Sequence, residues 1–401
     1  MKHPILRALS IRSFSYLMLS ELFSQIAMNL LNFVLLILVF NLVRSSIAVS
    51  GVILAFTIPA LFFGILAGIY VDRWNKKHVL FYTNLLRAIL VFPLFFLNTS
   101  IFSIYAIIFL VSLVTQFFIP AEAPIIPLIV ERKLLFSANA LFSMGIFASI
   151  LIAYAVSGPF LLFFGDSNGF IMITALFLFS SFFAYFIRMK KNHITESIGA
   201  RRVRLDFRKT LRLLGRIKKV TASLFILTLL QTVVLSIAVV GPGFAENILK
   251  IRVEEFPVLF ITPSVIGMGI GALLLGNFFH EASKRFMVRL GMFIIGASLL
   301  FSPYVLSLAG KNIIYAAITL AFFMGIAFAL IFIPANTVVQ EQTSDQMRGK
   351  VYGVLNTLVG GVSAIPVLAV GGVSDVFGVE KVLFFMGFTL LSISLIRWGI
   401  K

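Results

Sequence analysis

The sequence predicts an all-α polytopic membrane protein with twelve transmembrane helices. Hydrophobic residues make up 60% of the 401 residues, the mean hydropathy is +1.07, and charged residues account for only 12%. A soluble domain has no use for that much apolar surface. The apolar residues also gather in runs that are each long enough to cross a bilayer as a helix. Short polar segments separate these runs. Segments rich in basic residues alternate along the chain with segments that contain few.

The predicted spans follow from these runs in chain order. The first run is about 30 residues long, well beyond the apolar core of a cleavable signal peptide, which has about 7–15 residues. We therefore expect it to be the first membrane helix. The twelve predicted spans are residues 13–42, 46–71, 78–97, 100–130, 137–164, 168–187, 221–245, 256–279, 286–308, 312–339, 351–374 and 382–399.

The charge pattern predicts the topology. The chain has 33 Lys and Arg against 15 Asp and Glu, a net charge of +18. A balance this basic is also found in nucleic-acid-binding proteins. Here, however, the basic residues concentrate in every second connecting segment, as they do in membrane proteins that keep them on the cytoplasmic side. We expect a multi-pass protein of the cell membrane with both termini in the cytoplasm, and no nucleic-acid partner.

Several kinds of chemistry have no residues to support them. The chain has no Cys, so it has neither a disulfide framework nor a thiolate metal site. Its four His residues are scattered near the ends of predicted spans, and no phosphate-binding loop of the Walker type occurs. We expect no metal, no cofactor and no enzymatic activity.

A basic segment divides the chain into two predicted halves. Residues 188–219 are rich in Lys and Arg and contain only Glu196 and Asp206 as acids. We expect residues 188–220 to be a cytoplasmic linker that contacts anionic lipid headgroups, although a regulatory site is an alternative. The predicted domains are then a six-helix bundle at 1–187 and a second one at 221–401.

The two halves contain matching sequence markers. The tetrapeptide Phe-Ile-Pro-Ala occurs at 118–121 in the fourth span and again at 332–335 in the tenth. A pair of glycines ends the fifth span, and a second pair ends the eleventh with the same spacing between its two members. Such parallel repeats indicate two pseudo-symmetric bundles with a substrate site near mid-membrane. The two glycine pairs are Gly158 with Gly165, and Gly371 with Gly378.

Three ionisable residues lie inside predicted spans. Glu21, Arg87 and Glu122 each lie about eight or nine residues from the inner end of their span, which is roughly 12–14 Å deep. An unpaired charge at the centre of a bilayer costs at least about 2.5–3.5 kcal/mol. Their equal depth makes mutual pairing feasible. Arg87 is predicted to be a structural partner of the two acids.

The two acids are the candidates for substrate binding or proton coupling. Glu122 lies among prolines, which remove backbone donors, so it can be a binding or proton site or simply an acid at a helix hinge. Glu21 lies in a polar stretch that fits a cavity wall. The remaining candidates are polar residues on predicted cavity-facing helices, and Asn336 occupies the repeat position of Glu122. They are Gln25, Asn29, Gln116 and Asn336.

The loop between the second and third spans has a distinctive pattern. An apolar run containing Gly64 and Gly68 ends at Asp72, and a short basic loop leads directly to the next run. The two glycines lie on one face of a helix, where another helix can approach closely. This segment resembles the signature loop of the major facilitator superfamily, G-x-x-x-D-R-x-x-R/K-R/K. The basic residues of the loop are Arg73, Lys76 and Lys77.

The likeness extends along most of the chain. It resembles the efflux branch that includes macrolide and siderophore exporters at Ser24-Gln25, Leu86–Ala88, Val339–Glu341 and Arg348–Gly353. The resemblance implies two six-helix bundles that work by alternating access. Because a carboxylate suits the free N–H groups at a helix N-terminus, we also predict that Asp72 approaches the start of the eleventh span, near Arg348, when the inner gate is closed.

A partial antiporter pattern lies in the fifth span. Gly145, Gly158 and Pro159 are similar to the motif that antiporters of the superfamily carry there, although close helix packing is an alternative explanation. We expect a monomeric secondary transporter that exports hydrophobic or amphipathic small molecules by proton antiport. A lysophospholipid transporter or an uncoupled facilitator is the alternative, and a non-transporting membrane receptor is a more distant one.

Overall fold

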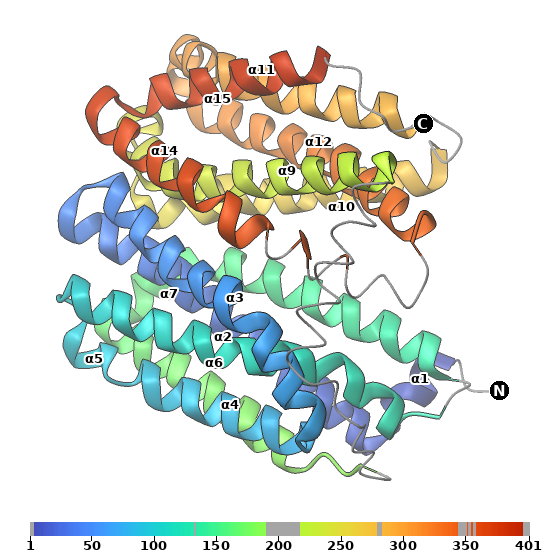
Figure 1. The fold of residues 1–401 in the computed structure, drawn as a ribbon. Helices are drawn as coiled ribbons and strands as arrows, with labels where there is room; N and C mark the ends of the chain where they lie inside the picture. The colour runs from blue at the N-terminus through green and yellow to red at the C-terminus, as the bar shows by residue number, and fades with distance from the viewer. Residues whose placement is uncertain are drawn as a thin grey trace. The chain divides into compact units, whose positions relative to one another are not determined.

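The computed structural model describes residues 4–131, 134–189, 217–278, 283–343, 351, 354–355 and 358–395 (Figure 1). These residues form helices joined by short turns, and no strand occurs among them. Within the described part of the chain, ten ranges are long and apolar enough to cross a membrane. One of them, Lys284–Glu341, contains two helices, so the predicted count of twelve remains a prediction.

The helices agree with the predicted spans to within a few residues at most boundaries. In the first half they are α1 (Pro4–Leu9), α2 (Arg12–Val43), α3 (Ser46–Arg73), α4 (Lys76–Val91), α5 (Leu94–Leu97), α6 (Ile101–Ile129) and α7 (Leu135–Tyr185). In the second half they are α9 (Lys218–Gly243), α10 (Thr262–Phe278), α11 (Lys284–Ala309), α12 (Ile313–Glu341), α14 (Ala364–Phe377) and α15 (Val379–Leu395).

Local sequence explains where several helices begin and end. The side chain of Asn75 accepts a hydrogen bond from the backbone N–H of Lys77, which caps the start of α4. Ser100 caps α6 in the same way through the N–H of Ser103. Helix α4 ends before Pro93, a residue that cannot continue its hydrogen-bond ladder.

Two glycines give structural support to the internal repeat. Gly165 interrupts α7 with φ 68° and ψ 178°, and Gly378 separates α14 from α15 with φ 90° and ψ 156°. Both lie in the region of positive φ where a side chain would be strained. The same backbone turn therefore recurs at the positions that the sequence markers matched.

The chain forms two compact units, each described here by itself. Unit 1 consists of residues 1–38 and 54–203, and unit 2 consists of residues 39–53 and 204–401. In unit 1, α4 packs against α6 and α7. In unit 2, α12 packs against α9, α10 and α11, and α11 packs against α15.

Glycines allow the helices of unit 2 to approach very closely. A Cβ atom on Gly325 would lie 1.8 Å from the carbonyl oxygen of Ser264, and one on Gly267 would lie 2.0 Å from that of Phe322. These two contacts join α10 to α12. A second close crossing, at Gly296 and Gly387, joins α11 to α15. Small residues at helix crossings are the usual basis of packing within a membrane.

Residues 39–53, the end of α2 and the start of α3, belong to unit 2. Asp375 at the end of α14 accepts hydrogen bonds from the backbone N–H groups of Ser46 (2.6 Å) and Ile47 (3.1 Å) and from the hydroxyl of Ser45 (2.5 Å). A carboxylate is well suited to a helix N-terminus, where free N–H groups carry partial positive charge. Asp375 is thus the N-terminal cap of α3.

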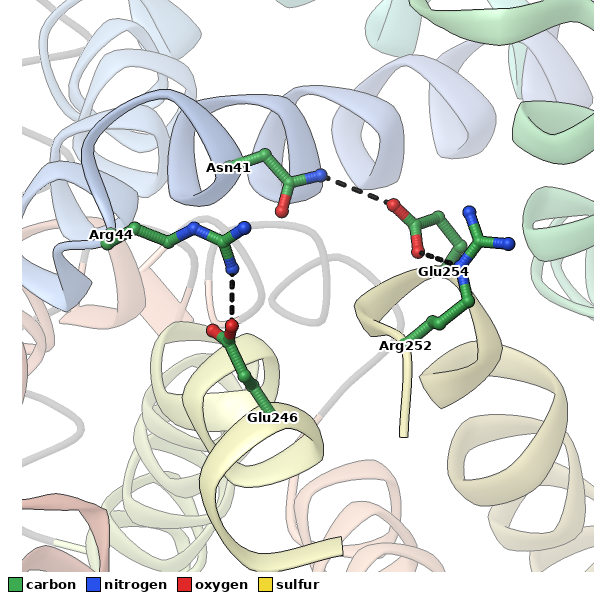
Figure 2. Close-up of polar contacts among 5 residues, drawn as sticks. All are labelled: Asn41, Arg44, Glu246, Arg252 and Glu254. Carbon is green, nitrogen blue, oxygen red and sulfur yellow. Dashed lines mark hydrogen bonds and ion pairs between the residues drawn. The ribbon is translucent and has the colours of Figure 1, made fainter. Parts of the chain in front are cut away.

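Two further polar contacts hold the same segment in unit 2 (Figure 2). Arg44, a residue with φ 54°, forms an ion pair of 2.7 Å with Glu246. Asn41 donates a hydrogen bond of 3.3 Å to Glu254, which is also 3.5 Å from Arg252.

Candidate functional site

The three ionisable residues predicted inside spans come together within unit 1. Glu21 lies on α2, Arg87 on α4 and Glu122 on α6. Glu21 is 2% exposed and Arg87 is 1% exposed, so both are effectively removed from solvent. The carboxyl groups of Glu21 and Glu122 lie close enough to interact, and both interact electrostatically with Arg87.

The guanidinium of Arg87 is held by neutral neighbours. It donates hydrogen bonds to the hydroxyl of Ser24 (2.9 Å) and to the side-chain oxygen of Asn84 (3.1 Å). Ser24 in turn donates to the same Asn84 oxygen at 3.0 Å. The guanidinium carbon also lies 4.3 Å from the ring centroid of Phe118 and 5.8 Å from that of Phe177, which is cation–π geometry.

The acids are held differently. Glu21 accepts a hydrogen bond of 2.7 Å from Gln25, one turn along α2. Glu122 has one buried carboxylate oxygen without a hydrogen-bond partner, and Nε of Arg87 is also buried without one. No direct ion pair within 4.0 Å joins Arg87 to either acid in the described part of the chain. Arg87 and Glu122 thus each have a buried polar atom without a hydrogen-bond partner, which is unusual in a folded protein.

Two other candidates of unit 1 lie near this cluster in sequence but are bonded to their own helices. Gln116 is buried, and its amide donates to the carbonyl of Ser112 at 3.2 Å. Asn29 donates to the carbonyl of Gln25 at 2.8 Å. Asn336, the repeat counterpart of Glu122, lies on α12 in unit 2.

The signature loop is described only in part. Lys76 is buried and its ammonium lies 3.4 Å from the carbonyl oxygen of Val71, at the end of α3. Lys77 lies 5.1 Å from the ring centroid of Tyr185. The side chains of Asp72 and Arg73 lie outside the described residues.

The predicted contact between Asp72 and the start of the eleventh span cannot be followed, because Arg348 lies outside the described residues. The same holds for most of the predicted basic linker at 188–220. Among the described residues, no atom lies within 4 Å of a Cβ built on Gly68, and the closest to one on Gly64 is Oε1 of Gln116, at 3.5 Å. Gly64 therefore lies in ordinary contact with α6, and the close helix approach expected at the two glycines stays a prediction.

The glycine motif of the fifth span lies in the first part of α7. A Cβ on Gly145 would lie 2.7 Å from the terminal methyl of Met18 on α2, so this glycine does allow close packing. Gly158 is buried and the adjacent Pro159 is exposed within the same helix.

Sequence reasoning missed the residues that hold Arg87. Asn84 precedes Arg87 by three positions, which places both on one face of a helix, and this spacing was an available signal. Phe118 belongs to the repeated tetrapeptide, but nothing in the sequence indicates that its ring faces a cation. The described residues contain no group of His, Asp and Glu side chains that could hold a metal ion.

Comparison with known proteins gives the family. The sequence profile of the Major Facilitator Superfamily matches residues 17–367. The chain belongs to this superfamily. It is 24% identical over 388 residues to the MFS-type transporter YfmI of Bacillus subtilis, covering 93% of both chains.

A second relative and a solved structure extend the comparison. The chain is 24% identical over 334 residues to BacE of Bacillus subtilis, provisionally named a bacilysin exporter, covering 78% of this chain and 76% of BacE. The nucleoside transporter NupG has the same fold, with a TM-score of 0.77 at 15% identity over 95% of this chain and 98% of NupG. This member of the Major Facilitator Superfamily is thus a multi-pass, all-α membrane transporter.

Proposed function

We propose that this transporter exports hydrophobic or amphipathic small molecules in exchange for protons, by alternating access. The observation that carries the proposal is the cluster of Glu21, Arg87 and Glu122, in which Glu21 and Arg87 are buried. An Arg side chain stays charged in a protein, so one carboxylate is enough to balance Arg87. The second carboxyl group is then free to take up and release a proton while the cluster stays close to neutral.

Glu122 is the better candidate for that second carboxyl group. Glu21 has Gln25 as a hydrogen-bond donor, whereas one oxygen of Glu122 has no partner. Pro120 and Pro124 flank Glu122 within α6 and remove backbone donors beside it. A group with unused hydrogen-bonding capacity is the one that a proton or a substrate can engage. The provisional name of BacE adds support for the direction of transport, because that protein is named an exporter.

The test is transport in proteoliposomes with and without an imposed pH gradient, over a panel of amphipathic drugs and lysophospholipids. We expect Glu122→Gln to abolish gradient-driven accumulation and to keep substrate exchange at equal pH. Glu380→Gln, which changes an exposed acid at the start of α15, is the matched control and should keep both activities.

Two other outcomes redirect the proposal. Full gradient-driven transport by Glu122→Gln, with its loss in Glu21→Gln, moves the coupling role to Glu21. Wild-type transport that ignores the gradient, or that is confined to lysophospholipids, favours the uncoupled facilitator or the lysophospholipid transporter.

A further inference from the structure

The tip of the α2–α3 hairpin, residues 39–53, belongs to one half of the chain by sequence and to the other by contact. By sequence it lies in the predicted first bundle, at the predicted outer ends of the first two spans. By contact it belongs to unit 2, although α2 up to residue 38 and α3 from residue 54 belong to unit 1. Alternating access moves one half of a transporter against the other. A state in which the outer ends of the halves separate must therefore break the contacts of this hairpin tip.

The hairpin tip packs very closely on α14. A Cβ atom on Gly371 would lie 2.2 Å from the hydroxyl oxygen of Ser50 and 2.8 Å from the carbonyl oxygen of Ser46. The nearest described atom to a Cβ on the adjacent Gly372 belongs to the Ile47 side chain, at 3.7 Å, which is ordinary contact. The crossing of α3 with α14 thus depends on Gly371 and on small polar side chains.

The polar contacts of the hairpin tip are open to water on one side. Asp375 accepts its three hydrogen bonds from the start of α3 while it remains exposed. A cavity of about 630 Å³ borders these bonds, and its lining includes Asp375 together with the ion pair of Arg44 and Glu246 (Figure 2). Water can replace hydrogen bonds of this kind, so breaking them costs little free energy. The contacts are therefore suited to repeated release and return.

We infer that the hairpin tip is a releasable latch, which is closed on α14 in this structure and opens once in each transport cycle. Asp375 is the residue that holds it closed, because its carboxylate caps α3 and is lost to α3 when the tip leaves. The inference rests on the alternating-access part of the proposed function. It does not depend on proton coupling or on the identity of the substrate.

Because the chain has no Cys, one engineered disulfide can lock the latch. The hydroxyl oxygens of Ser46 and Ser374 lie 3.3 Å apart, which suits a disulfide in Ser46→Cys combined with Ser374→Cys. We expect oxidation to remove most of the substrate exchange at equal pH in proteoliposomes, and reduction to restore it. Thr232→Cys combined with Ser363→Cys, whose hydroxyl oxygens are 2.5 Å apart within unit 2, is the matched control and should keep exchange when oxidised. Unimpaired exchange by the locked protein would overturn the inference.

A second measurement needs no transported substrate. Ser46 is 3% exposed, so a membrane-impermeant maleimide can reach Ser46→Cys only when the latch opens. We expect this variant to react several-fold faster than Ser302→Cys, whose serine is 1% exposed near the predicted outer end of α11. Adding Asp375→Asn should accelerate the reaction of Ser46→Cys several-fold further. Labelling of Ser46→Cys as slow as that of Ser302→Cys, with or without Asp375→Asn, would overturn the inference whatever the protein transports.

The adjacent glycines of α14 test the packing of the latch separately from its cap. Gly371→Ala places a methyl group against Ser46 and Ser50 and should hold the latch open, so labelling of Ser46→Cys should become several-fold faster. Gly372→Ala is the matched control, because its methyl group fits beside Ile47 and should leave labelling unchanged. Equal labelling rates in the two variants would contradict a latch that closes on α14.

Discussion

The two units place their charges in different ways. Among the described charged residues, Glu21, Arg87 and Lys76 are buried, and all three belong to unit 1. The described charges of unit 2 lie at the ends of its helices instead, as in the ion pair between Lys284 and Glu341. Unit 1 thus has buried charges, whereas the buried polar contacts described in unit 2 are between neutral groups, such as the hydrogen bond of 3.0 Å from Ser50 to the Val367 carbonyl.

The closest contacts of the glycines also differ between the two units. In unit 1, Gly145 faces the flexible end of Met18 at 2.7 Å from a built Cβ, whereas Gly325 and Gly267 of unit 2 each face a backbone carbonyl at 2.0 Å or less. Gly68 of unit 1 and Gly269 of unit 2 have no described atom within 4 Å of a built Cβ. Closely packed interiors resist small displacements, because their contacts leave no room for adjustment. At Gly325 and Gly267, a side chain larger than hydrogen fits only if the backbone of the neighbouring helix moves.

The largest effect is expected from removing the cation of unit 1. Arg87→Met keeps much of the side-chain volume and leaves Glu21 and Glu122 without the charge that balances them. We expect a loss of about 3 kcal/mol in the free energy of unfolding, measured by titration with SDS in mixed micelles, together with loss of transport. Adding Glu122→Gln should recover part of the stability, since the two changes are coupled. Strictly additive effects would show that the cluster is not an electrostatic unit.

The next effect tests the packing of unit 2. Gly325→Ala places a methyl group against the backbone of α10, so we expect a loss of about 2–3 kcal/mol in the free energy of unfolding. Gly68→Ala is the matched control in unit 1, where the same methyl group meets empty space. It should leave stability unchanged or raise it by up to about 1 kcal/mol, because Ala is the better helix former. Equal losses in both variants would remove the packing difference between the units.

The smallest effect concerns the cap of α3. Asp375→Asn removes the charge and one acceptor from the helix N-terminus, which should cost about 1 kcal/mol. Hydrogen exchange should become faster at the amides of Ser46 and Ile47, because Asp375 accepts from both. Arg44→Gln is the comparison variant. Its ion pair with Glu246 is half-exposed, so we expect a change of at most about 0.5 kcal/mol and no local change in exchange at Ser46. Unaltered exchange in Asp375→Asn would contradict the assignment of the cap.

The fold was largely predictable from the sequence for a simple physical reason. Apolar runs long enough to span a bilayer have few alternatives to a helix, and a charge inside such a run stands out at once. Glu21, Arg87 and Glu122 were found in this way, and their similar depth made mutual pairing feasible. The structure brings the three residues together without an ion pair within 4.0 Å among these described side chains. The roles assigned to them stay predictions.

The side-chain contacts that the sequence did not predict depend on which helices are neighbours and how each is rotated about its axis. The contact of Arg87 with Ser24, and the orientation of the Phe118 ring toward it, follow from helix packing that a periodic apolar sequence does not specify. Asp375 was missed for a related reason. It lies at the end of an apolar run, where an acid is common in any loop. Its partners at Ser45 to Ile47 are distant in sequence.

The cap of α3 also bears on how the chain is made. Asp375 and the Ser46 amide that it binds are 329 residues apart, so this bond closes one of the longest loops that the chain permits. During synthesis the first helices enter the membrane long before α14 exists. Until α14 is synthesised, the amides at the start of α3 lack the carboxylate that binds them in the complete protein. Residues 39–53 are therefore synthesised early and reach their final contacts late. A ribosome stalled before α14 would leave a nascent chain in which the N-terminus of α3 has no cap.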